Sequence, residues 1–275
     1  MKNPYKKATY RPLLGSGTKT VKGEKIGFLT GILYLLPSLK ICAMSALAGC
    51  IGPCLNTAGR GAFTSTQKAR DKKTQFFHDQ IEAFMWAIAA DIWTLQRKAD
   101  RLGMTLLIRL NGTSDILWEH ISVADWGFKN IFELFPEVQF YDYTKHPARN
   151  ILDITNYDLT YSYSGITPEK ITLKAVTQPN ARVAVVFHKR SEIPATFRGW
   201  PVIDGDETDV RHIEPGGVVV ALYAKAKAKH ETDGFVQRAG VHYELEEEVT
   251  HKEEQTYEEW AEGKYETETR GYHGK

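Results

Sequence analysis

The chain has 275 residues, 42% of them hydrophobic and 25% charged, which is ordinary for a globular protein with room for one large α/β domain or two small ones. The formal net charge of +1 gives no global electrostatic case for binding nucleic acid or an anionic membrane. Residues 1–7 lack the apolar stretch of a secretory signal, and the one long apolar run, 26–55, is interrupted by Pro37, Lys40 and glycines. The sequence therefore predicts a cytoplasmic protein with no membrane contact.

Residues 1–25 are rich in lysine, arginine and glycine. They predict a solvated basic N-terminal arm, with an arm that contacts phosphate as the alternative. Apolar residues dominate 26–36, which we expect to form a first buried strand or a pair of short strands. This strand leads directly into the most distinctive segment of the chain.

All three cysteines, Cys42, Cys50 and Cys54, lie within thirteen residues, with seven and then three residues between them. Glycines and Pro53 crowd the same segment. Glycine allows backbone N–H groups to approach a bulky anionic group because no Cβ stands in the way. Three thiolates with inward-facing amides suit an iron–sulfur cluster, which needs sulfur ligands for iron and donors for its sulfides. The sequence predicts that these cysteines are the metal ligands.

Three other interpretations of the cysteines stay open. Free cysteine is often an ordinary buried residue, although an ordinary core would not confine all three to one short segment. A zinc site usually has cysteines in closely spaced pairs and a fourth ligand nearby, which the seven-residue gap fits poorly. A disulfide would leave one thiol unpaired, and nothing in the sequence indicates a small secreted protein.

After the cysteines, apolar residues recur at spacings of three and four from Thr64 or Ser65 to about Arg101, which predicts one long helix ended by Gly103. Short apolar strands then alternate with loops and helical stretches, and we expect strands at 105–110, 138–143, 157–164, 182–187 and 218–223. Such strands are typical of parallel sheets buried on both faces. The predicted fold class is α/β, a partial (βα) barrel of mostly parallel strands with the cysteine loop after the first strand. An open doubly wound sheet is the alternative.

Polar residues follow the predicted strands. Because the carboxyl ends of parallel strands share one side of a sheet, we expect Asn111, Asp115, Lys145 and His188 to converge beside the cysteines and to bind a cofactor there. A helix cap is the simpler interpretation of Asp115, and an ordinary buried histidine is the simpler one of His188.

Two acidic segments come later in the chain. Residues 204–209 predict a solvated turn, because the glutamate that ends a calcium loop is absent. Glutamates are dense from Glu244 onward. The expected organisation is a basic arm at 1–25, a single α/β domain that holds the iron–sulfur cluster at 26–230, and an acidic tail or helix at 231–275.

Three segments between about residues 18 and 225 together resemble a family of phage-encoded proteins called gene product 88. They are the Cys-x7-Cys-x3-Cys motif followed by Leu55 and Asn56, the stretch 109–115 and the stretch 140–145. The resemblance implies a viral protein of the host cytoplasm whose cysteines hold a [4Fe–4S] cluster.

A three-cysteine loop after the first strand of a partial barrel also resembles radical S-adenosylmethionine enzymes. That resemblance implies S-adenosylmethionine as a second cofactor. The loop differs from their usual Cys-x3-Cys-x2-Cys spacing, and Asn111, Gly112 and Thr113 stand where their Gly-Gly-Glu element is expected.

Three functions follow from these observations. The first is a redox or electron-transfer iron–sulfur protein. The second is an enzyme that binds a substrate or S-adenosylmethionine at the iron without a cysteine ligand. The third is a zinc-stabilised module whose basic arm binds nucleic acid. The sequence identifies neither a redox partner nor an oligomeric state.

Overall fold

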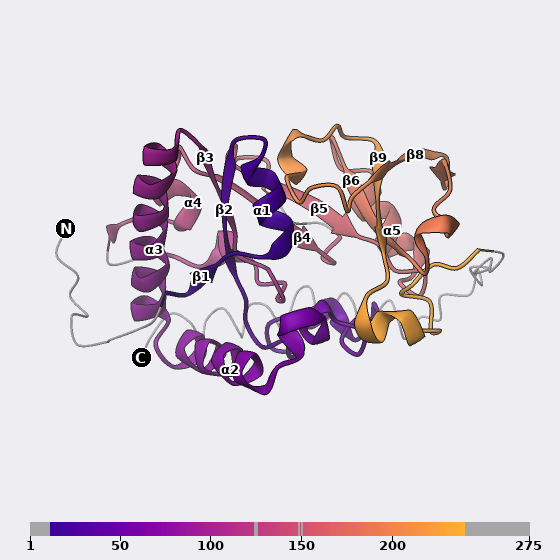
Figure 1. The fold of residues 1–275 in the computed structure, drawn as a ribbon, viewed down its shortest axis with the longest axis horizontal. Coiled ribbons are helices and arrows are strands. Elements are labelled where there is room, and N and C mark those ends of the chain that lie inside the picture. Colours follow the sequence, from indigo (N-terminus) through magenta and orange to yellow (C-terminus); the bar gives the residue numbers. More distant parts are fainter. Residues whose placement is uncertain (1–11, 124–125, 148, 150, 240–275) are drawn as a thin grey trace.

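The structure is a computed structural model that describes residues 12–123, 126–147, 149 and 151–239 (Figure 1). A nine-stranded sheet runs through it in the order β1-β2-β3-β4-β5-β6-β9-β8-β7. The strands are β1 (Leu14–Gly15), β2 (Phe28–Leu33), β3 (Thr105–Arg109), β4 (Gln139–Thr144), β5 (Tyr157–Ser162), β6 (Arg182–Phe187), β7 (Thr196–Phe197), β8 (Trp200–Asp204) and β9 (Val218–Tyr223).

Most neighbours in this sheet are parallel. Every pairing from β2 through β6, and on through β9 to β8, is parallel, whereas β1 and β7 pair antiparallel at the two edges. Leu29 lies opposite Leu106, and Val185 lies opposite Ala221. Within the described residues no pairing joins the two edges, so the sheet is unclosed. The predicted α/β class with mostly parallel strands is confirmed.

Helices and short 3-10 turns connect the strands. The α-helices are α1 (Thr18–Glu24), α2 (Thr64–Asp79), α3 (Ile81–Leu102), α4 (Ile131–Leu134) and α5 (Glu169–Val176). The 3-10 turns are η1 (Ala43–Ser45), η2 (Leu55–Thr57), η3 (Gly59–Ala62), η4 (Trp118–His120), η6 (Arg190–Glu192), η7 (Arg211–Ile213) and η8 (Ala226–His230). In the described part of the chain, none of the helices has the length and apolar character needed to cross a membrane.

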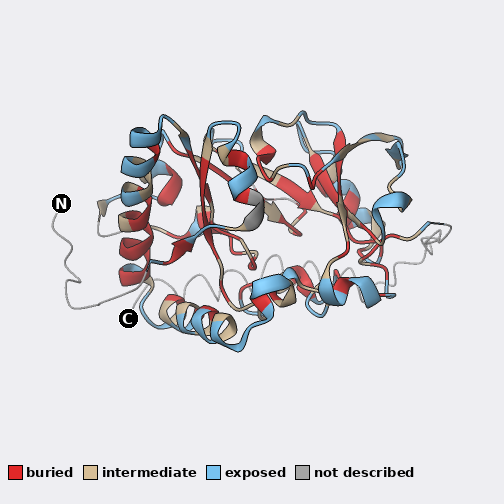
Figure 2. Cartoon of the chain, viewed as in Figure 1, coloured by how far each residue is buried: buried red, intermediate tan, exposed pale blue. Residues whose placement is uncertain are grey.

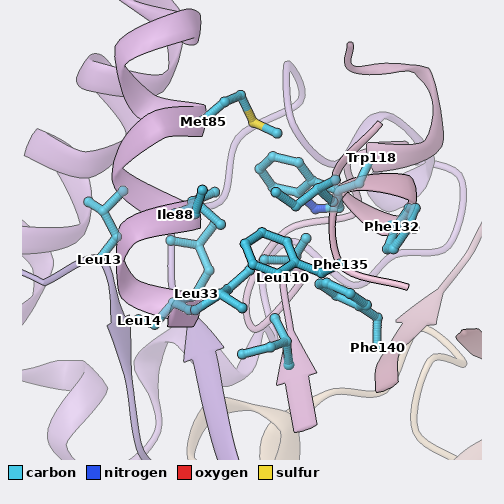
Figure 3. Packing of buried hydrophobic residues seen from close by; sticks show 14 of the residues in the cluster. Leu13, Leu14, Leu33, Met85, Ile88, Leu110, Trp118, Phe132, Phe135 and Phe140 are labelled. Carbon is cyan, nitrogen blue, oxygen red and sulfur yellow. The ribbon is translucent and has the colours of Figure 1, made fainter. Parts of the chain in front are cut away.

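The main hydrophobic core lies between α3 and the strands β1 to β4 (Figures 2 and 3). Leu33, Phe84 and Ile88 are completely buried there. Helix α3 approaches β2 so closely that a Cβ added at Gly31 would lie 2.5 Å from Cδ1 of Leu95. Truncating a core side chain such as Ile88 to alanine costs about 2–5 kcal/mol. This packing fixes β2, and therefore the start of the cysteine loop.

The single long helix that the sequence predicts is two helices. Gln80 interrupts it with φ −146° and ψ 61°, which is not helical. Figure 1 shows α3 upright beside the sheet and α2 lying below it. Phe77 and Phe84 lie seven residues apart, on either side of the break, and pack edge to face with ring centres 5.4 Å apart. The apolar spacing typical of a helix therefore continues across the break. Gly103 ends α3 with φ 64°, as predicted.

Part of the expected basic arm is folded. β1 pairs with β2, and Leu13 and Leu14 are buried in the core, so residues 13–15 belong to the domain. The first eleven residues of the predicted arm, and residues 240–275 of the predicted acidic tail, lie outside the described residues. Before them, Val236 is completely buried and Gln237 pairs with Phe187, so the domain extends beyond the expected boundary at 230.

Candidate functional site

The cysteine loop connects the carboxyl end of β2 to α2 and is tied to the loop that follows β3. The N–H of Asp115 donates to the carbonyl oxygen of Ile41 over 2.8 Å. The hydroxyl of Thr113 donates to the carbonyl of Leu35 over 2.6 Å. The two neighbouring strands thus hold the loop at one edge of the sheet, where their carboxyl ends meet.

Two glycines of the loop are required by its packing. Gly49 has φ 61°, and a Cβ there would lie 2.5 Å from Cδ1 of Ile166. A Cβ at Gly61 would lie 2.5 Å from the carbonyl oxygen of Asn56. Glycine at these two positions allows the loop to fold tightly. This packing role is separate from the approach of backbone amides to an anionic group that the sequence suggests.

The three cysteines are free and half-buried in this loop. Burial raises the pKa of each thiol. The pKa of Cys42 is raised further by Asp115 and then by Cys54 and Cys50, so the three thiols are within electrostatic reach of one another. The thiol of Cys42 donates to the carbonyl of Thr113 over 3.8 Å. Because a bound metal needs thiolates, binding one here would release protons.

The potential metal donors of the loop are its three thiols, with backbone amides near them. Across the described ranges, no group of three or more His, Cys, Asp or Glu side chains has an arrangement that could hold a metal ion. A cluster makes a different demand, because each cysteine ligates a separate iron and the thiolates stand further apart than around one ion. The N–H of Asn56 already donates to the sulfur of Cys54 over 3.4 Å, which is the kind of amide–sulfur contact that cluster ligands receive.

Asp115 joins the loops that follow β3 and β4. One carboxylate oxygen accepts from the hydroxyl of Thr144 over 2.8 Å, and the other accepts from the N–H of Lys145 over 2.7 Å. Arg149 adds an ion pair at 3.7 Å. Through these contacts Asp115 links two loops and does not cap a helix. Its carboxylate also raises the pKa of Cys42, so it is within electrostatic reach of that thiol.

Lys145 has a buried ammonium group within electrostatic reach of Cys50. Its Nζ donates to the carbonyl and the hydroxyl oxygen of Ser162, over 2.7 and 3.1 Å, and lies 4.7 Å from the centre of the Phe235 ring. Burial lowers the pKa of Lys145, and the charges of Cys50 and Asp115 oppose that shift. The structure therefore brings Asp115 and Lys145 to the cysteines.

Asn111 and His188 have other contacts. The Oδ1 of Asn111 accepts from the N–H of Ile116 over 2.9 Å and from the indole of Trp118 over 3.1 Å, while its Nδ2 donates to the carbonyl of Ile116 over 2.9 Å. Asn111 thus shapes the loop that carries Asp115. His188 lies at the end of β6 as predicted, and its Nδ1 is 3.4 Å from a carboxylate oxygen of Glu192.

Arg70 of α2 is a site residue that the sequence reasoning misses. Its guanidinium is stacked 4.9 Å from the ring centre of Tyr34 and donates to the carbonyl of Asn56 over 3.1 Å. It lowers the pKa of Cys54, so it is a second cation near the thiols. Arg70 is buried although it lies in a polar helix, and nothing in the local sequence separates it from the solvated lysines around it.

A second buried polar cluster lies on the face of the sheet opposite α3. The carboxylate of Asp209 pairs with Nη1 of Arg109 at 3.0 Å and accepts from the hydroxyls of Tyr141 and Tyr143, both at 3.4 Å. The prediction of a solvated turn at 204–209 is therefore wrong for Asp209, although Glu207 is exposed. Asp206 is buried too and accepts from Nζ of Lys225 over 2.8 Å. Partners distant in sequence neutralise these carboxylates.

A cavity of about 270 Å³ lies along β4, β5 and β6. Its lining includes Thr144, Arg149, Tyr157, Tyr161 and Arg182, and none of the cysteines. The cavity therefore lies apart from the thiols, and His146 and the lining hydroxyls are its candidate reactive groups.

No curated protein and no solved structure matches the chain. The model of one protein family, described as gene product 88, matches residues 9–239 and so covers the described domain from end to end. The chain belongs to the gene product 88 family.

Proposed function

We propose that this chain binds a [4Fe–4S] cluster through Cys42, Cys50 and Cys54 and uses it for one-electron redox chemistry in the cytoplasm of a phage-infected host. The observation that supports the proposal is the grouping of three half-buried thiols in one loop, where Cys54 and Cys50 raise the pKa of Cys42 and the cations Lys145 and Arg70 lower the pKa of Cys50 and Cys54. A cluster with thiolate ligands is an anion, and buried positive groups and amide donors stabilise it.

We also propose that the sheet is a partial barrel. The strands from β2 to β6 are neighbours in chain order and all parallel, which is the order of a βα barrel. A doubly wound sheet reverses its strand order near the middle. No such reversal occurs between β2 and β6, which supports a barrel-like curl with the cysteine loop at its carboxyl rim.

Serine substitutions test the ligand assignment. Cys42→Ser, Cys50→Ser and Cys54→Ser should each strongly reduce the iron content of protein purified without oxygen, and should reduce the absorbance near about 400 nm with it. Ser45, which is buried in the same loop, provides a matched control as Ser45→Ala, and this variant should keep its iron. A serine variant that retains all of its iron and an unchanged spectrum would refute the assignment.

An enzyme is the second candidate, and the number of thiolates favours it. A [4Fe–4S] cluster has four irons and the chain has three cysteines, so one iron needs another ligand. S-adenosylmethionine is the candidate for that position. If it binds there, adding it to the reduced protein should change the electron paramagnetic resonance signal of the cluster. An unchanged signal with reversible reduction would favour electron transfer.

A further inference from the structure

We propose that the surface of the cysteine loop, residues 38–63, together with η8, is the docking site for an acidic electron-carrier protein. This proposal rests on the proposed cluster and deepens it by naming the class of partner. The carrier would donate one electron, becoming oxidised by one electron as the cluster becomes reduced by one, and no covalent bond would form or break.

Exposed apolar side chains are concentrated in the cysteine loop. Five of the twelve exposed large hydrophobic residues in the described part of the chain lie between residues 38 and 63. They are Leu39, Leu47, Ile51, Leu55 and Phe63, with exposed fractions from 37% to 61%. Exposed apolar residues concentrated in one loop make that loop a candidate contact surface.

The charge of this surface has one sign. The segment 38–63 contains no aspartate or glutamate, whereas Lys40 and Arg60 are exposed. Turn η8 contacts η2 directly after Cys54, and it adds exposed Lys227 and Lys229. Figure 1 shows this orange turn beside the purple loop at the bottom of the view. The described surface is thus apolar with a basic rim.

This combination fits an acidic carrier. Charges at the rim of an interface mainly accelerate and orient the encounter, and the apolar centre excludes water from the contact. Leu55 immediately follows Cys54, so a protein seated here would lie directly against the proposed cluster. A carrier with an acidic face complements the lysines, whereas a basic protein would be repelled.

The test measures how fast a reduced acidic [2Fe–2S] ferredoxin transfers an electron to the full chain, and how tightly the two proteins bind by calorimetry. We expect transfer to slow as salt rises from about 20 to about 200 mM, because screening weakens the attraction. The double variant Lys227→Glu/Lys229→Glu should lower the rate by about tenfold at low salt. Leu47→Asp should weaken binding.

The control variant is Arg97→Glu/Lys98→Glu, which reverses two exposed charges near the end of α3. α3 ends just before β3 begins, so these residues lie toward the amino edge of the sheet, away from the cysteine loop. This variant should change the rate less than about twofold. Equal loss of rate in the two double variants would overturn the proposal.

Carbodiimide cross-linking separates the possible occupants of the surface, because it joins lysine to carboxylate groups in direct contact. Cross-links from Lys227 or Lys229 to ferredoxin are expected. Cross-links instead to glutamates of residues 240–275, or to a second copy of the chain, would assign the surface to those occupants and overturn the proposal. Iron is measured in the same samples: a chain without iron refutes the cluster, whereas iron without ferredoxin binding refutes the docking site alone.

Discussion

The buried ammonium group of Lys145 is within electrostatic reach of Cys50, so its charge should influence a metal centre at the thiols. Reducing a cluster adds negative charge, and a nearby cation stabilises the reduced form. We expect Lys145→Met to make the reduction potential more negative by on the order of 60 mV, the shift that corresponds to a tenfold change in a one-electron equilibrium. Voltammetry or a redox titration measures it. Lys98→Met, at an exposed site on α3, should leave the potential unchanged. An unaltered potential in Lys145→Met would place the ammonium group too far from the cluster to act.

Asp142 gives a pH dependence of stability that does not need the cluster. Burial raises the pKa of its carboxyl group to about 7, although Arg109 and a hydrogen bond from the N–H of Asn111 oppose the shift. The folded protein therefore binds the proton more tightly than the unfolded chain, so the stabilisation is complete below about pH 4 and is lost as pH rises toward 7.

The free energy of unfolding should accordingly fall between about pH 4 and pH 7, by about 1.4 kcal/mol for each unit of the shift. In Asp142→Asn this part of the slope should disappear. Urea titrations at several pH values measure it. An identical slope in the variant would show that Asp142 stays ionised when folded.

The side chain of Asn111 holds the loop after β3 in its conformation. Asn111 is buried and bonds to Ile116 through both its oxygen and its nitrogen. Asn111→Ala leaves the indole N–H of Trp118 and backbone groups of the loop without partners, so we expect it to lower the free energy of unfolding by about 2–4 kcal/mol. It should also loosen Asp115. Chemical denaturation measures the first effect, and a variant as stable as the parent would contradict the account.

Elements with strong local patterns could be predicted, and elements fixed by distant contacts could not. The strands at 105–110 and 182–187 are continuous apolar runs, and β3 and β6 appear there. The break at Gln80 is invisible in the sequence because Phe77 and Phe84 maintain helical spacing across it. The sequence does not predict β7 and β8, because they are short, none of their residues is fully buried, and β8 contains Pro201.

The residues of the candidate site also differ in whether a local sequence pattern indicates them. The sequence predicts that the cysteines and the polar residues after β3 and β4 lie on one side of the sheet, because parallel strands place their carboxyl ends together. Arg70 reaches the site from α2, and Asp209 reaches Arg109 across one hundred residues, and neither position has a local signal. Contacts of this kind follow from tertiary packing alone.

For the whole molecule, the pair between Arg109 and Asp209 fastens the segment before β9 onto the face of the sheet opposite α3. Both side chains are largely buried, with exposed fractions of 12% and 7%. Asp209→Asn removes the closest carboxylate from a buried guanidinium, so we expect a loss of about 3–5 kcal/mol in the free energy of unfolding. Asp204→Asn, at the exposed pair with Arg190, should cost at most about 1 kcal/mol. Equal effects in the two variants would contradict the assignment.

The measurement that tests the central claim most directly is the content of iron, acid-labile sulfide and zinc in the full chain purified without oxygen. We expect about four irons and about four sulfides per chain, with a broad absorbance near about 400 nm that disappears on removal of the iron. One zinc per chain without sulfide, or a protein with neither metal, would contradict it.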